Sequence, residues 1–410
     1  MPTSELLPNL RHLRTFQEAC RQRSISRAAD IVHLSQPAAT QAIARLEEQL
    51  GCALLERVGT GVVPTAGGSA YVVRVERALR MIETGATEAG CLADHPPAHA
   101  HELLPRLTST LLRAFLAVGG TGNFRLAAPL AGTSQPTLHR SARELEDVLG
   151  FALLEKTTRG TTLTAAGERF WQQVRLAFAE LDQGLSELRA TQGIEDGRIL
   201  VGCLPLARHD LLPNAIAAFT ARHPRVPIHV IESPYPALLQ DLRRGEIDVL
   251  IGALRHPSPA PDVVQELLFS ASLCIAAGPD HPLAGKSGVS LAELAAWPWV
   301  VPPHDTPTRE RFEKLMAAHP EVAEHGLIES SSQILIRGLL RNSHRLTLIS
   351  TQQVRLEIEL GLLACIDHAL GPTLREIGLA TRSGWRPTVI QHDFLDCLRG
   401  AATALDTDAP

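Results

Sequence analysis

Residues 35–56, SQPAATQAIARLEEQLGCALLE, are closely matched by residues 134–155, SQPTLHRSARELEDVLGFALLE. The similarity extends without a gap over residues 13–68 and 112–167, so that each position matches the one 99 places later. A repeat of this length is too long for a solenoid period and indicates duplication of a whole small domain. The pattern alone leaves one alternative, a duplicated helical module that makes only protein contacts.

Both copies predict the same order of elements. The first helix of copy one carries four regularly spaced apolar residues, Leu10, Leu13, Phe16 and Ala19. Ser35 can cap a third helix in which Pro37 occupies the first turn, where an amide hydrogen would have no partner anyway. Gly51 can end that helix, and strand-like segments around Gly61 and Gly160 precede a longer helix. Three short helices, a hairpin and a long helix form a winged helix-turn-helix unit, so we expect two such units in tandem.

Composition limits the possible classes of protein. The 410 residues are 45% hydrophobic and 20% charged, as in folded globular proteins. A net charge of −5, with the acidic excess in the second half, excludes a generally basic coat, so any nucleic-acid contact must be local. Seven scattered cysteines indicate free thiols in a reducing compartment. No signal-peptide pattern opens the chain and no apolar run is long enough for a membrane span, so we expect a cytoplasmic protein without membrane contact.

The second copy carries the more specific motifs. Ser134-Gln135-Pro136 opens a helix that leads through Leu149-Gly150 to Arg159 and then to Leu163-Thr164-Ala165-Ala166-Gly167. With these motifs, residues 107–178 resemble the N-terminal domain of LysR-type transcription regulators. The first copy departs further from the family, because Thr60 replaces the wing arginine and Gln41 stands where arginine is usual. The family normally carries one such unit, so the tandem arrangement is itself a departure.

The resemblance implies double-stranded DNA as a partner, with the helix after each Ser-Gln-Pro motif in the major groove. Arginine can bind guanine and glutamine can bind adenine through paired hydrogen bonds, while hydroxyls and helix N-termini suit phosphates. The alternative is a helix face exposed only to solvent. The predicted DNA contacts are Ser35, Gln36, Pro37, Thr40, Gln41, Ser134, Gln135, Pro136, Thr137, His139, Arg140, Arg143 and Arg159.

Strands and helices alternate in the second half of the chain. We expect strands at 198–203, 226–231 and 249–254, with amphipathic helices between them. Parallel strands flanked by helices bind ligands at their carboxyl ends. This rule makes Leu204, Pro205 and Ala253 candidates for the rim of a ligand site.

The same region, from about Gly197 to Leu398, resembles the effector domain of LysR-type regulators, which is similar to periplasmic binding proteins and has two α/β lobes. Segments such as 204–208 and 241–248 are most similar to the subgroup named for regulators of a galactose-binding protein. In the second lobe, Thr306, Thr308 and Arg309 precede one helix, and Ser331 and Ser332 precede another. Hydroxyls and free amides at a helix N-terminus suit a carboxylate, sulfate or phosphate, although they are also typical of ordinary N-caps.

These patterns predict a multi-domain chain with two α-helical winged helix-turn-helix domains followed by a two-lobed α/β domain like that of periplasmic binding proteins. The expected boundaries are 1–93 for the first winged unit, 94–104 for a linker, 105–167 for the second winged unit, 168–192 for a dimerisation helix and 193–410 for the effector domain, with lobe 1 at about 197–268 and 370–410 and lobe 2 at about 269–369.

The predicted function is sequence-specific transcription regulation under control of a small polar or anionic organic effector bound between the lobes. An enzyme is the first rival, but the chain lacks the motifs of hydrolases, zinc proteases and nucleotide-binding enzymes, so we expect no enzymatic activity, no cofactor and no metal site. A solute-binding protein is the second rival. The long front half and the absence of a signal-peptide pattern argue against it.

We also expect a homo-oligomer, either a dimer or a tetramer. The helix at 168–189 would pair with a second chain through an apolar face made of Phe170, Val174, Ala177, Phe178, Leu181, Leu185 and Leu188. Copy one would lie flexibly on the segment 94–102. It would bind DNA more weakly than copy two and extend the contact rather than determine the main site.

Overall fold

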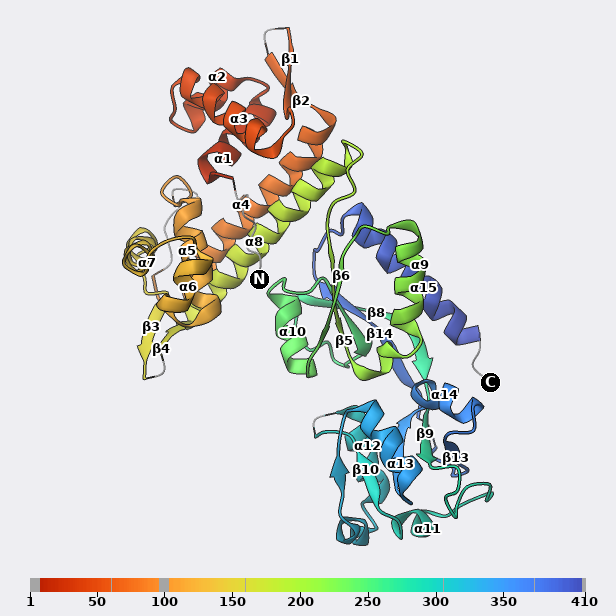
Figure 1. Ribbon diagram of the computed structural model, residues 1–410. Helices are drawn as coiled ribbons and strands as arrows, with labels where there is room; N and C mark the ends of the chain where they lie inside the picture. Colours follow the sequence, from red (N-terminus) through yellow and green to blue (C-terminus); the bar gives the residue numbers. More distant parts are fainter. Residues whose placement is uncertain are drawn as a thin grey trace. The chain divides into compact units, whose positions relative to one another are not determined.

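The computed structural model describes residues 8–59, 61–95, 103–158, 160–304, 306–371 and 373–407. The chain divides into two compact units, which are Met1–Arg198 with Arg243–Glu246, and Ile199–Leu242 with Ile247–Pro410. The first unit contains two winged helix-turn-helix copies, and the second contains two α/β lobes (Figure 1). The predicted fold class is therefore confirmed.

The two copies have the same elements in the same order. Copy one consists of α1 (Leu10–Gln22), α2 (Ile25–Ile31), α3 (Gln36–Leu50), the hairpin of β1 (Leu55–Val58) and β2 (Gly61–Pro64), and α4 (Ala66–Leu92). Copy two consists of α5 (Ser109–Thr121), α6 (Phe124–Leu130), α7 (Gln135–Leu149), the hairpin of β3 (Leu154–Thr157) and β4 (Gly160–Leu163), and α8 (Ala165–Ala190). Ser35 and Ser134 cap α3 and α7, and Gly51 and Gly150 end these helices in the left-handed conformation, as predicted.

Buried contacts explain why the same residues recur at equivalent positions of both copies. Oε1 of Glu47 accepts hydrogen bonds from the backbone amides of Leu54 and Leu55 at 2.8 and 3.1 Å, which fixes the wing to the preceding helix. Glu146 accepts the equivalent two bonds in copy two, at 2.8 and 3.0 Å. A Cβ at Gly68 would lie 2.0 Å from the carbonyl oxygen of Leu54, so only glycine fits where the long helix passes the wing. The repeated Leu-Glu, Leu-Leu and glycine positions are thus structural.

The long helices α4 and α8 pack along each other in opposite directions. Gly85, in the later part of α4, lies against Gln173 in the earlier part of α8, and Gly184, late in α8, lies against Arg74, early in α4. A Cβ at Gly85 or Gly184 would come 2.5 or 2.9 Å from the facing Cβ, so glycine permits the close approach of the two helices. Figure 1 shows the helices side by side, with one winged unit at each end of the pair.

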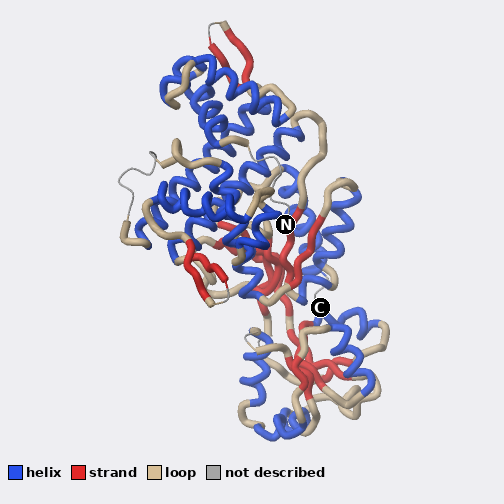
Figure 2. The backbone as a smooth tube through the Cα atoms, turned by 60° about the vertical axis from the view of Figure 1, so that its left-hand side comes forward, coloured by secondary structure: helices blue, strands red, loops and turns tan. Residues whose placement is uncertain are grey.

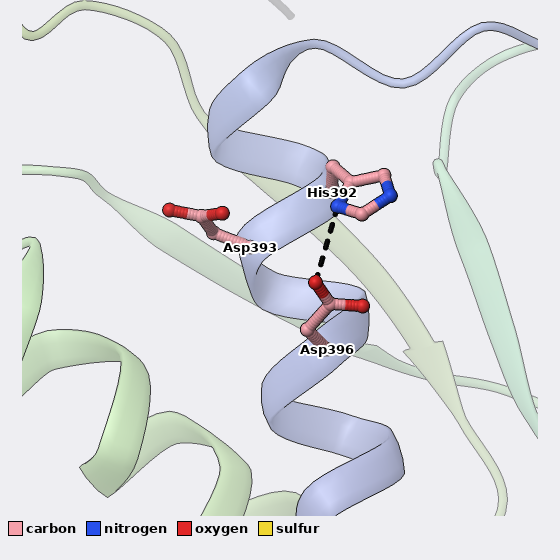
Figure 3. A group of neighbouring side chains, drawn as sticks. All are labelled: His392, Asp393 and Asp396. Atoms are coloured by element: carbon pink, nitrogen blue, oxygen red, sulfur yellow. Dashed lines mark ion pairs between the residues drawn. The ribbon is translucent and has the colours of Figure 1, made fainter.

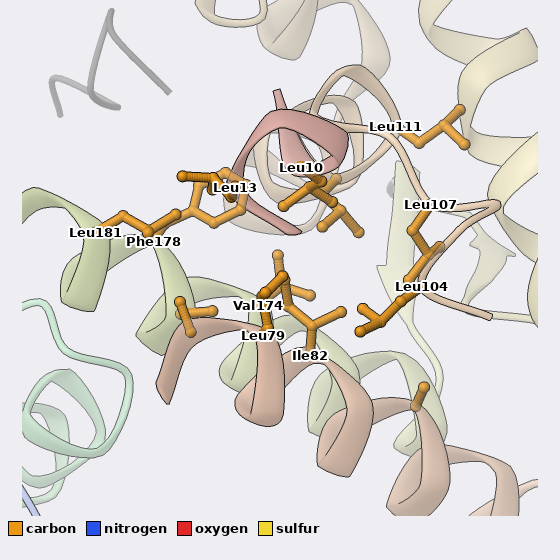
Figure 4. Close-up of a cluster of buried hydrophobic side chains, with 14 of the residues drawn as sticks. Leu10, Leu13, Leu79, Ile82, Leu104, Leu107, Leu111, Val174, Phe178 and Leu181 are labelled. Atoms are coloured by element: carbon orange, nitrogen blue, oxygen red, sulfur yellow. The ribbon is translucent and has the colours of Figure 1, made fainter. Parts of the chain in front are cut away.

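A large hydrophobic core is shared by both copies. The cluster joins side chains of copy one, such as Leu13 and Leu79, to side chains of copy two, such as Leu111, Val174 and Leu181 (Figure 4). The apolar face of α8 that was predicted to pair with a second chain lies in this cluster or against it. Its residues are Phe170, Val174, Ala177, Phe178, Leu181, Leu185 and Leu188.

Two predictions are therefore wrong. The apolar face of α8 exists, but α4 of the same chain covers it instead of a second chain. Copy one does not lie flexibly on a tether, because its helices share a buried core with copy two. Its starting turn is also attached directly, since the amide of Leu10 donates a 3.1 Å hydrogen bond to Oγ of Ser109.

Buried ion pairs hold one half of the α4–α8 pair. Arg74 donates to Glu180 at 2.9 Å and also bonds Glu187, while Arg77 donates to Glu180 at 2.9 Å. The side chains of Arg74 and Glu180 are only 3% and 5% exposed. Burial acts to raise the pKa of Glu180, but the hydrogen bonds and charges of Arg77 and Arg74 outweigh burial, so its pKa is lowered and the carboxylate stays ionised.

Lobe 1 of the second unit is a five-stranded sheet in the order β6-β5-β7-β14-β8. Its strands are β5 (Ile199–Cys203), β6 (Ile228–Glu232), β7 (Val249–Ala253), β8 (Val263–Ala271) and β14 (Arg375–Arg382). Strand β5 runs parallel to β6 and β7, and β14 is antiparallel to β7 and β8. Val249 and Ile251 face α9 (Leu211–Arg222) and α15 (Val389–Thr407), whereas Leu250 faces α10 (Tyr235–Arg243), so helices cover both faces of the sheet.

Lobe 2 has a second sheet in the order β11-β10-β12-β9-β13. Its strands are β9 (Leu273–Ala277), β10 (Trp299–Val301), β11 (Ile328–Glu329), β12 (Leu346–Ser350) and β13 (Ala364–Ile366), and its helices are α11 (Leu291–Ala295), α12 (Pro307–Met316), α13 (Gln333–Asn342) and α14 (Thr351–Glu359). In both lobes the strands lie centrally with helices outside them (Figure 2). The chain crosses between the lobes at Ser272 and again between β13 and β14, so the predicted boundary at 268/269 falls inside β8.

Replacing Arg74 by methionine should destabilise the first compact unit, which contains both winged copies. The change leaves Glu180 buried with one cation fewer, which costs on the order of 3–5 kcal/mol in the free energy of unfolding. Urea titration of the full chain, followed by far-ultraviolet circular dichroism, measures this loss. Arg169→Met is the matched control, because the Arg169–Glu88 pair lies on the same helices but its side chains are 30% and 41% exposed. An exposed pair contributes at most about 1 kcal/mol. Equal losses in the two variants would contradict the role assigned to Arg74.

Candidate DNA-binding and effector sites

Helix α3 presents a polar face to solvent. Thr40 and Gln41 are exposed together with Ala44, whereas Ala39 and Ile43 are buried in the core of copy one. The helix begins at the exposed Ser35-Gln36-Pro37 motif, where Oγ of the serine accepts a bond from the amide of Ala38. The predicted contacts of copy one therefore lie on one accessible surface that includes a helix N-terminus, a feature suited to phosphate.

Helix α7 presents a more basic face in copy two. Arg140 and Arg143 are exposed, and Ser134, Gln135, Pro136 and Thr137 form the first turn beside them. The ring of His139, another predicted contact, is half-buried and stacks on Phe124 with centroids 3.6 Å apart. Burial, aided by the charges of Arg143 and Lys156, lowers the pKa of His139, so its imidazole is neutral at pH 7. The two arginines are the exposed cations of this face.

Each wing also carries a cation that the sequence interpretation overlooked. Arg57 on β1 and Lys156 on β3 are exposed and occupy equivalent positions of the repeat. The offset of 99 residues aligns them, and this signal was available in the sequence. The predicted wing contact Arg159 and its counterpart Thr60 lie outside the described residues. Copy one thus retains one basic wing residue.

In lobe 1, the predicted effector residues lie together at the carboxyl ends of two neighbouring strands. The amide of Leu204, just after β5, donates a 2.9 Å hydrogen bond to the carbonyl of Ile251 in β7. Pro205 follows in a short 3-10 turn, and Ala253 ends β7 opposite Ile377 of β14. All three predicted residues are half-buried. The expectation that ligand residues follow the carboxyl ends of parallel strands therefore selected three residues that lie together, at the carboxyl ends of β5 and β7.

In lobe 2, the predicted residues have unequal roles. Thr306 caps α12 by accepting from the amide of Arg309 at 3.2 Å, and Ser332 caps α13. Arg309 is 8% exposed and donates to Glu313 and Glu329 at 2.7 and 3.2 Å. Ordinary capping therefore accounts for the two hydroxyls, and ion pairs assign Arg309 to anchoring the first turn of α12.

Thr308 and Ser331, the other predicted hydroxyl residues of lobe 2, are not the N-caps of α12 and α13. Ser331 is exposed immediately before the cap of α13. The hydroxyl of Thr308 accepts a hydrogen bond from Nη1 of Arg375, at the start of β14. Because Ile377 pairs with Ala253, this bond connects α12 of lobe 2 to the sheet edge of lobe 1. The structure thereby brings Thr308 close to the lobe 1 candidates but places Ser331 on a separate helix end.

Two arginines of this region were not among the predicted residues. The guanidinium of Arg255 lies over the ring of Tyr235, 4.5 Å from its centroid, and its buried Nε has no hydrogen-bond partner. Burial lowers the pKa of Arg375, and the charge of Arg255 lowers it further. Among the residues that the structure describes, neither arginine has a carboxylate partner. No local motif marks them, because the turn after β7 and the start of β14 are far apart in sequence.

A group of His392, Asp393 and Asp396 on α15 has donor atoms close enough to hold a metal ion (Figure 3). Its carboxylates already have cationic or imidazole partners. Asp393 lies 3.0 Å from His223, and Asp396 lies 2.9 Å from Arg399 and 3.2 Å from His392. An ion-pair network explains these side chains. Within the described residues, no helix combines the length and apolar character needed to cross a bilayer.

Comparison with known families agrees with this arrangement. The family described as bacterial regulatory helix-turn-helix protein, lysR family, matches twice, at residues 10–69 and 109–168. The family described as LysR substrate binding domain matches residues 192–403, which is more than half of the chain. The chain belongs to the LysR-type transcriptional regulators. It therefore combines DNA-binding helix-turn-helix units with an effector-binding domain and acts in regulation, not as an enzyme.

Individual relatives support this assignment. The transcriptional regulator GalR of Pseudomonas putida is 33% identical over 97% of this LysR-type regulator and 98% of its own length. PcaQ of Agrobacterium fabrum is 27% identical over 72% of this chain and 94% of its own length. A full-length variant of OxyR from Pseudomonas aeruginosa shares the fold with a TM-score of 0.52, at 21% identity over 72% of this chain and 96% of that chain. Membership of a particular subgroup stays a prediction.

Arg140→Ala should weaken binding of this LysR-type regulator to its preferred duplex by about 1–3 kcal/mol, because an arginine that binds guanine loses both hydrogen bonds. Titration at fixed salt, with a duplex obtained by selection from random DNA, measures the change. Arg225→Ala is the control, since Arg225 is an exposed arginine of the effector unit and the change in net charge is identical. Equal weakening by both variants would show that Arg140 contributes only general electrostatic attraction.

Proposed function

We propose that this LysR-type regulator binds a small anionic organic effector where its two lobes meet, and that binding alters how the winged units engage DNA. Regulation of transcription follows from the family, whereas the chemical class of the effector and its contacts are the proposal. We also expect a homo-oligomer, a dimer or a tetramer, and a cytoplasmic location, since a bacterial regulator must reach the chromosome.

The charge arrangement around Thr308 carries the proposal. Arg255 and Arg375 are close enough for their charges to repel, and both are partly removed from water. Two like charges at a partly buried place are unfavourable unless an anion compensates them. A carboxylate is the natural anion, because the planar guanidinium group donates two parallel hydrogen bonds to its oxygens. This geometry favours an organic acid over a neutral polar molecule.

Neighbouring groups supply further contacts for such a ligand. The hydroxyl of Thr308 already faces Arg375, so it can bond to the same anion. Tyr235 offers an aromatic ring beside Arg255 for the carbon skeleton. Leu204, Pro205 and Ala253 line the adjacent sheet edge, and Ser331 is a second hydroxyl candidate in lobe 2. The proposed site therefore combines cationic, hydroxyl and apolar groups.

The position of Arg375 connects binding with a change of state. Arg375 lies where the chain returns from lobe 2 to lobe 1, and it bonds Thr308 of lobe 2. An anion held by both residues would contact both lobes at once. A ligand shifts a conformational equilibrium only by its difference in affinity for the two states, and contacts from both lobes provide such a difference when the lobes move.

Thr308→Val should reduce carboxylate affinity about 2- to 10-fold, the effect expected for one lost hydrogen bond. Arg375→Met should reduce it by more than about tenfold, because a charged donor is lost. The measurement is a thermal-shift titration of the full chain with a panel of organic carboxylates, each paired with its neutral amide, since bound ligand raises the unfolding temperature by mass action.

Thr220→Val and Arg225→Met are matched controls, and they should leave the titration unchanged. Thr220 lies in the last turn of α9 and Arg225 lies between α9 and the start of β6, at the end of the lobe 1 sheet opposite to the proposed site. Ser331→Ala tests the second hydroxyl in the same assay. If carboxylates and amides stabilise the chain equally, the effector is not recognised as an anion. If Thr308→Val and Arg375→Met both leave affinity unchanged, the site lies elsewhere.

A further inference from the structure

We infer that a single chain carries a complete pair of DNA-binding surfaces, which binds one operator made of two unlike half-sites. The inference rests on the proposed contacts of α3 and α7 with DNA. It concerns how many chains occupy an operator and whether its halves are equivalent. The relation between the two copies, the distance between their ends and the chemistry of their exposed faces support it.

The first argument is an internal two-fold relation. Gly85 of α4 and Gly184 of α8 are equivalent positions of the repeat, and so are Arg74 and Gln173. Gly85 lies against Gln173, and Gly184 lies against Arg74, so the same contact occurs twice with the copies exchanged. Reciprocal contacts of this kind define a two-fold relation, in which equivalent positions touch each other near the axis. Leu10 and Ser109 do so, because the amide of the first donates to the hydroxyl of the second at 3.1 Å. The two copies are therefore related as the halves of a dimer.

The second argument is the distance that the helix pair spans. Helix α4 has 27 residues, which corresponds to about 40 Å. Because α4 and α8 are antiparallel and each begins at its own wing, α3 with its wing and α7 with its wing lie at opposite ends of this pair (Figure 1). Dimeric helix-turn-helix proteins contact half-sites about 34–36 Å apart, one turn of DNA. The internal pair has the dimensions needed for adjacent major grooves.

The third argument is that the two exposed faces differ. Gln41 in copy one occupies the position of Arg140 in copy two, and Ala44 occupies that of Arg143. Glutamine pairs with adenine, whereas arginine pairs with guanine. A homodimer presents the same residues to both half-sites and selects a palindrome. This chain presents different residues, so its two half-sites should differ.

The buried charges oppose replacement of the internal pair by a pair of α8 helices from two chains. In such a pair, Glu180 would face a second copy of Gln173 and Leu176, which are the repeat equivalents of Arg74 and Arg77. A buried carboxylate without a cation is strongly unfavourable. In the α4–α8 pair, Arg74 and Arg77 neutralise Glu180. Pairing of α8 with α4 of the same chain is therefore favoured over pairing with α8 of another chain, even if the effector domains join two chains.

Selection of bound sequences from random duplexes tests the inference with the full chain and with its Gln41→Ala and Arg140→Ala variants. We expect a site with two unlike half-sites centred about one helical turn apart. Gln41→Ala should relax preference in one half only, and Arg140→Ala in the other half only. Both residues are exposed, and unchanged thermal unfolding of each variant would show that the fold is retained.

The spacing of the selected site gives a second measurement. Insertion of about five base pairs between the half-sites turns one by half a helical turn, and a rigid internal pair should then lose roughly tenfold or more in affinity. Arg225→Ala in the effector unit is the matched control in both experiments.

The outcomes separate the inference from the proposed function. A palindromic site whose two halves both relax in Arg140→Ala, or affinity that does not depend on the inserted spacing, would overturn the single-chain arrangement while leaving sequence-specific DNA binding intact. Failure to enrich any sequence would overturn the proposed contacts of α3 and α7 themselves. Unlike half-sites that respond separately to the two variants would support the inference.

Discussion

The packing of α4 against α8 determines the organisation of the front half of this regulator. The helices approach closely at Gly85 and Gly184, and their contact encloses an ionised carboxylate, Glu180, that Arg74 and Arg77 neutralise. A winged unit is small, and a small domain buries a limited fraction of its surface. Here one core extends through both copies, so each copy completes the core of the other. The orientation of α3 and α7 within this unit follows from that shared core.

In the second compact unit, which contains the effector domain, the main constraint is a pair of like charges without an anionic partner among the described residues. Arg255 and Arg375 approach each other at the edge of the lobe 1 sheet, and the described residues offer them an aromatic ring and a hydroxyl but no carboxylate. Other arginines of the unit, such as Arg309 and Arg399, have carboxylate partners. This contrast distinguishes groups that stabilise the fold from groups suited to an external anion.

Much of the architecture could be predicted because local chemistry determines it. The serine caps, the terminal glycines and the spacing of Leu10, Leu13 and Phe16 depend on neighbours within one or two helical turns. The pairing of α8 could not be predicted in this way. An apolar helical face indicates that something covers it, but not whether the covering helix belongs to the same chain. Arg255 and Arg375 were missed for a related reason, because they are 120 positions apart in the sequence and only the sheet brings them together.

Duplication within one chain changes what the two DNA-binding surfaces can become. In a homodimer, one substitution alters both surfaces, so a change that suits one half-site acts on the other as well. In the tandem pair, Gln41 and Arg140 can differ while the shared core and the bonds of Glu47 and Glu146 keep both wings in place. The effector domain follows α8 alone, so only copy two is joined directly to it. Unlike half-sites would then fix the direction in which the regulator lies on its operator, a property that a palindrome bound by two identical winged units does not provide.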